Sequence, residues 1–145
     1  MKLGTFALPI LSGLGLASPS AANAEEVAKA RVSTYVATVD PSAFHRAPLE
    51  HKKLGATVNP ASVRMITPGV DKFSIYTLIG PPHFGEGITR RWNYVLFFPV
   101  SPGSTERVRC RMEIRFERLR GHYNVTVSEV IWQEQSCADR VASAN

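Results

Sequence analysis

The sequence has few of the features that define enzymes and metalloproteins. Its 145 residues include only two cysteines, and these do not form the Cys-x-x-Cys motif of redox proteins. The four histidines lack the spacing of metal ligands, and no serine or aspartate stands in a nucleophile motif. We therefore expect a protein that is not an enzyme, with no metal site and no cofactor.

The sequence also lacks an apolar run long enough for a transmembrane anchor. The N-terminal run from Leu3 to Leu16 is short and is broken by glycine and proline. It follows Lys2 and leads into small residues that end in Ala22-Asn23-Ala24, as in a secretory signal peptide. We expect residues 1–24 to be a signal peptide, cleaved after Ala24, and the mature protein to be periplasmic. No cysteine lies near this site to accept a lipoprotein anchor.

Export changes the interpretation of Cys110 and Cys137. In an oxidising compartment, a cysteine pair in a small domain usually forms a disulfide. Two unpaired buried thiols or a redox pair are the alternatives. A disulfide requires the chain around Cys137 to fold back over the apolar face of the strand that carries Cys110.

The chain has a small excess of positive charge. The net charge is +5, and removal of Lys2 lowers it to +4. Four arginines alternate along the segment 106–117, but glutamates lie among them (arginines 107, 109, 111 and 115; glutamates 106, 113 and 117). Mixed signs are typical of a solvated sheet face rather than of a polyanion site, although phosphate binding is the alternative. Together with export, this argues against a nucleic acid partner.

Helix signals begin near Asn59. In residues 25–39 the periodicity does not decide between helix and strand, and residues 40–59 show no sustained hydrophobic period. Residues 25–58 are interpreted as an N-terminal arm or linker. Asn59 can cap a helical turn that starts at Pro60. Asp71 can cap a second helix that runs to Ile79, with Phe73, Ile75, Tyr76, Leu78 and Ile79 as its apolar stripe. Gly80 and the two prolines after it end this helix.

Three strands follow these helices. The segment 91–100 has apolar residues on both faces, 106–117 alternates strictly, and 123–133 forms the third strand. In the third strand the apolar positions shift from odd to even between Val127 and Val130, which indicates a bulge or burial of both faces. The folded domain is expected to span 59–137, with 138–145 as a C-terminal tail.

Motifs in this order resemble the BamE domain, also called the SmpA/OmlA family, of bacterial outer-membrane assembly. The motifs are the helix entry, the helix end with its Gly-x-Pro break, the W-x-Y strand and the Pro-Gly hairpin (Ile66, Gly69, Val70, Asp71; Ile75, Ile79, Gly80, Pro82; Trp92, Tyr94; Pro102, Gly103). The lipoprotein cysteine typical of the family is missing. The resemblance implies an α+β fold, with two short helices packed on a three-stranded antiparallel sheet.

The resemblance also implies a binding or scaffolding role. Its implied partners are envelope or outer-membrane assembly proteins and, in addition, acidic lipid headgroups. An alternative function is a secreted or periplasmic enzyme inhibitor, because the domain resembles the repeat of β-lactamase inhibitor proteins. Phe84, Arg90 and Arg91 combine an aromatic group with two cations near a loop edge, and we expect them to contact the partner.

Overall fold

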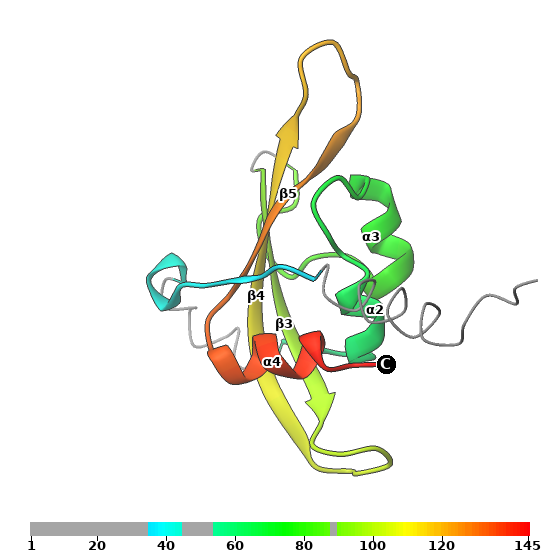
Figure 1. The fold of residues 1–145 in the computed structure, drawn as a ribbon, viewed down its shortest axis with the longest axis vertical. Coiled ribbons are helices and arrows are strands. Elements are labelled where there is room, and N and C mark those ends of the chain that lie inside the picture. The colour runs from blue at the N-terminus through cyan, green and yellow to red at the C-terminus, as the bar shows by residue number, and fades with distance from the viewer. Residues whose placement is uncertain (1–34, 45–53, 88–89) are drawn as a thin grey trace, which may run out of the picture. The chain divides into compact units, whose positions relative to one another are not determined.

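The computed structural model describes residues 35–44, 54–87 and 90–145; the expected signal peptide lies outside these residues. The described residues form a five-stranded sheet in the order β1-β5-β4-β3-β2, and Figure 1 labels its three central strands. Its three long strands are antiparallel neighbours: β3 (Arg91–Pro99), β4 (Arg107–Arg118) and β5 (Val125–Trp132). Two short strands, β1 (Thr38–Val39) and β2 (Ala56–Thr57), run parallel to β5 and β3 at the edges.

The predicted three-stranded antiparallel sheet is therefore right for the centre and wrong for the edges. Each edge strand has only two residues, too few to show the alternation from which a strand is predicted. Both come from the segment 25–58 that we interpreted as an arm. A short 3-10 helix, η1 (Pro41–Ala43), follows β1 directly. The described parts of the arm are thus joined to the sheet.

One face of the sheet carries the core, as the alternation predicts. In β3, Trp92, Tyr94, Leu96 and Phe98 are all at most 1% exposed, and β4 contributes four buried residues to the same cluster (Cys110, Met112, Ile114 and Phe116). The register of β5 shifts where Arg115 pairs with Glu129 and Phe116 pairs with Val127, which leaves Ser128 as the extra residue. The predicted bulge in β5 is confirmed.

Two helices before β3 begin as the sequence indicates. In α2 (Pro60–Arg64) the Asn59 side chain accepts a hydrogen bond from the Ala61 N–H, and in α3 (Lys72–Ile79) Asp71 accepts one from the Phe73 N–H. Gly80 ends α3 with a φ of 83°, a value that favours glycine. The predicted stripe of α3 is only partly right: Ile75 and Ile79 are buried, whereas Phe73 is 70% exposed. Figure 1 shows α2 and α3 on one side of the strands.

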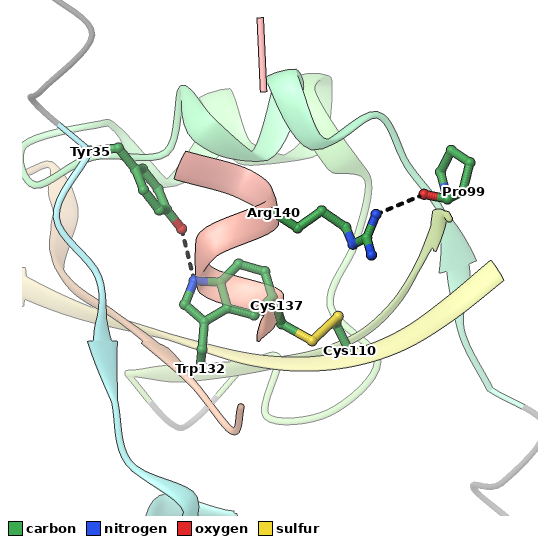
Figure 2. The surroundings of a disulfide bond; sticks show 6 residues. All are labelled: Tyr35, Pro99, Cys110, Trp132, Cys137 and Arg140. Carbon is green, nitrogen blue, oxygen red and sulfur yellow. Dashed lines mark hydrogen bonds between the residues drawn. A yellow bond between two sulfur atoms is a disulfide. The ribbon is translucent and has the colours of Figure 1, made fainter. Parts of the chain in front are cut away.

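A third helix, α4 (Gln135–Ala142), was not predicted and crosses the expected boundary between domain and tail at residue 137. Its three buried residues, Cys137, Ala138 and Val141, join the same core cluster. The structure contains the predicted disulfide between Cys110 and Cys137, so the chain after β5 does fold back over the core face (Figure 2). Arg140 fixes the helix further by donating to the carbonyl oxygens of Pro99 and Val100.

Candidate functional site

The loop after Gly80 lies along the edge of β3 that faces away from β4. Phe84 and Asn93 exchange backbone hydrogen bonds of 3.2 and 2.9 Å, and the Val95 N–H donates to Nδ1 of His83 at 3.1 Å. Further along β3, β2 continues this cover, and the Val58 N–H donates to the Phe97 carbonyl oxygen. Unpaired strand edges invite association with other chains. Here the loop and β2 together satisfy the edge.

Contacts between aromatic rings hold this loop in place. The ring of His83 meets the ring of Tyr94 edge-on, with centroids 6.0 Å apart, and the Tyr94 hydroxyl donates to the Gly80 carbonyl oxygen at 3.0 Å. Burial lowers the pKa of His83 below its ordinary value of 6.5. The hydrogen bond from Val95 requires an unprotonated Nδ1, which agrees with this direction. His83 is thus neutral when it holds the loop.

The structure divides the three residues expected to contact a partner. Phe84 forms an isolated antiparallel β-bridge with Asn93, so the two side chains lie on the same sheet face. Arg91, two residues before Asn93 in β3, lies on that face as well. Arg90 is exposed, and its carbonyl oxygen accepts from the Phe116 N–H. Its side chain lines a separate hollow. Phe84 and Arg91 therefore lie on one sheet face at the start of β3, whereas Arg90, next to Arg91 in the chain, lines the hollow.

That hollow, here called the basic pocket, has a volume of about 200 Å³ and is lined by three cations and two aromatic rings (Lys72, Arg90, Arg118, Trp92 and Phe116). Lys72 begins α3, Arg90 precedes β3 and Arg118 ends β4. Of these three cations, only Arg90 was predicted from the sequence to contact a partner. Lys72 and Arg118 are 46 positions apart in the chain, and only the packing of α3 against the strands brings them together.

A second hollow lies between α2 and α3 and is largely apolar. This α2–α3 groove has a volume of about 420 Å³ and is lined by residues from the end of α2 to the end of α3 (Met65, Val70, Asp71, Ser74, Thr77 and Leu78). Met65 is 63% exposed. Phe73, 70% exposed, lies next to Ser74 and shares a helix face with Thr77, four residues further on. Exposed apolar groups that gather in this way mark interaction surfaces.

The sheet face opposite the core is not the uniformly solvated surface that the alternating charges predict. Glu113 is only 4% exposed; it accepts from Arg115 Nε at 2.8 Å and from Asn93 Nδ2 at 3.3 Å. The hydrogen bond to Glu113 raises the pKa of Arg115. Phe44, after η1, is buried, with the Arg111 guanidinium 5.2 Å from its ring centre. Glu113, Arg115 and Arg111 on this face are therefore engaged in contacts within the protein.

Two other classes of site, a membrane-spanning helix and a metal centre, are absent from the described residues. Within residues 35–44, 54–87 and 90–145, no helix is long and apolar enough to cross a membrane. The same residues contain no group of three or more histidine, cysteine or acidic side chains placed to hold a metal ion. The two hollows and the loop along β3 are candidate interaction surfaces.

Comparison with known proteins gives one family. Residues 55–122 match the family model of the outer membrane protein assembly factor BamE domain, whereas no curated protein matches the chain. The match runs from β2 to the turn after β4 and includes the whole α2–α3 groove and the loop along β3. The resemblance found in the sequence is confirmed: residues 55–122 are similar to the BamE domain.

Proposed function

We propose that this protein is a periplasmic binding or scaffold protein that acts in outer-membrane protein assembly. The BamE-like domain supports the assembly role. The observation that carries a binding role is the α2–α3 groove with the exposed Phe73 beside it. A monomer gains nothing from a phenyl ring left in water, whereas burial of that ring against a partner is favourable.

The groove suits an apolar segment of an assembly protein. Met65, Val70 and Leu78 supply apolar walls, while Ser74 and Thr77 offer hydroxyl groups. An apolar centre with polar groups around it is the usual composition of a protein interface. Aromatic residues provide a large part of the binding energy at such interfaces, so Phe73 is the expected anchor.

We also propose a second contact at the start of β3, through Phe84, Arg90 and Arg91. Arg90 and Arg91 are both exposed, and the backbone pairing of Phe84 with Asn93 fixes the loop beside them. Acidic lipid headgroups are a further proposed partner of this cationic edge. Alanine substitution of the three residues tests the contact. Unchanged capture of every partner by the triple variant contradicts it.

Affinity capture from an envelope extract tests the proposed function. The bait is the mature protein, compared with Phe73→Ser and with Tyr123→Ser as the matched control, because Tyr123 is 96% exposed and lies outside the groove. We expect outer-membrane assembly proteins among the captured proteins, lost with Phe73→Ser and retained with Tyr123→Ser. Capture of a single soluble hydrolase instead would contradict the scaffold role and support an enzyme inhibitor.

A further inference from the structure

Trp92, one of the residues that line the basic pocket, carries a buried donor that the described structure leaves without a partner. Trp92 is fully buried, and its indole Nε1 has no hydrogen-bond acceptor among the described residues. The other tryptophan gives the contrast: Trp132 Nε1 donates to the Tyr35 hydroxyl at 2.9 Å (Figure 2). Buried polar groups are nearly always paired, because an unpaired one loses its hydrogen bonds to water without replacement.

Packing fixes the Trp92 ring in the wall of the pocket. Its centroid lies 4.8 Å from that of Phe116 and 5.1 Å from that of Tyr76, and Lys72 Nζ lies 4.9 Å from the ring centre. Rotation of the indole toward another partner would disturb these contacts. Trp92 is thus a rigid part of the pocket.

The charge of the pocket favours an anion. Lys72, Arg90 and Arg118 supply three cations, and no acidic side chain is found among the described residues that line it. Guanidinium groups bind carboxylate and phosphate oxygens through paired hydrogen bonds, and an ammonium group adds a point charge. An indole N–H can donate to the same kind of oxygen but accepts nothing.

We infer that the basic pocket binds the oxyanion of a carboxylate or phosphate group, held by Lys72, Arg90 and Arg118 and by a hydrogen bond from Trp92 Nε1. The volume of about 200 Å³ agrees with a group of this size. It is below the roughly 300 Å³ at which pockets for larger small molecules begin. The contact proposed above for Arg90 does not include Lys72, Arg118 or Trp92, which complete this site.

The two indole N–H signals in a ¹⁵N-resolved NMR spectrum report on the site directly. The mature protein is titrated with sodium phosphate and, separately, with sodium acetate, against sodium chloride at equal ionic strength. We expect the Trp92 signal to shift saturably with at least one oxyanion and not with chloride, while the Trp132 signal stays in place. Phosphate alone, or acetate alone, then identifies the class of oxyanion. Trp92→Phe assigns the signal.

Variants that each remove one positive charge distinguish binding of the oxyanion in the pocket from nonspecific electrostatic attraction to the protein. Arg90→Gln and Arg118→Gln each remove one lining cation, and we expect each to weaken binding about fivefold or more, since hydrogen bonds between charged groups are the strong ones. Arg109→Gln removes the same charge from the opposite sheet face and should leave the affinity unchanged. A linear, unsaturable shift, an equal shift in chloride, or equal weakening by Arg109→Gln would overturn the inference.

Discussion

At the scale of single residues, His83 makes the fold sensitive to pH. Its folded pKa is lowered by burial, so the neutral form is favoured in the native state. The stabilisation is therefore complete above the ordinary value of 6.5 and is lost as the pH falls through the lower, folded value. We expect the free energy of unfolding, measured in urea, to decrease between pH 7.5 and pH 5.

His83→Gln provides the control for this prediction. Glutamine offers an acceptor to the Val95 N–H but does not titrate. The variant should lose part of the pH dependence while it stays folded at pH 7.5. The same decrease in both proteins would show that another group is responsible.

Asp71 tests how much a single cap contributes. Its carboxylate accepts from the Phe73 N–H at 2.8 Å at the start of α3. Asp71→Ala should lower the free energy of unfolding by about 1 kcal/mol, whereas Asp71→Asn, which keeps an acceptor oxygen, should have a much smaller effect. Chemical denaturation of both variants at pH 7.5 makes the comparison. Equal losses in the two variants would argue against a capping role.

At the scale of elements, the disulfide attaches α4 to the middle of the sheet. Cys110 of β4 pairs with Leu96 of β3, and Cys137 lies 27 positions further along the chain. Closure of a loop of this length stabilises a protein by about 3 to 4 kcal/mol in the chain-entropy model. The double variant Cys110→Ala/Cys137→Ala should lose about that amount, and reduction of the native protein should have a similar effect. Unchanged denaturation after reduction would contradict this role.

Elements with a long periodic pattern were predictable, and short ones were not. The alternation of β4 and the caps at Asn59 and Asp71 specify structure within a few residues, so they could be identified from the sequence alone. The two-residue strands β1 and β2 depend on pairing with β5 and β3, partners distant in sequence. In α4, only Cys137, Ala138 and Val141 are buried, and so short a stripe in a polar segment gives a weak helix signal. The sequence therefore predicted a C-terminal tail from residue 138 onward.

At the scale of the whole domain, the candidate surfaces depend on packing between elements. Phe73 looks like a core residue in the sequence because it stands in an apolar helix, and only the orientation of α3 leaves it exposed. The basic pocket joins α3 to the start of β3 and the end of β4, a combination that no local motif records. Arg90 was identified because an arginine beside aromatic residues is a local signal, whereas Lys72 and Arg118 gave none.

The exposure of Phe73 beside the groove leads to a prediction about stability. Because Phe73 contacts the core little, Phe73→Ser should change the free energy of unfolding by no more than about 0.5 kcal/mol. Loss of partner binding in this variant would then reflect the surface and not the fold. Thermal unfolding of Phe73→Ser beside Tyr123→Ser measures this. A much larger loss for Phe73→Ser would mean that the ring stabilises the monomer.

Site-specific photo-crosslinking in living cells tests the central claim, a groove that binds an envelope assembly protein, most directly. A photoreactive phenylalanine analogue is placed at position 73 and, as the control, at position 123, which is exposed but lies outside the α2–α3 groove. We predict crosslinks from position 73 to an outer-membrane assembly protein and none to that protein from position 123. Crosslinks from both positions to the same proteins, or none from position 73, would contradict the account.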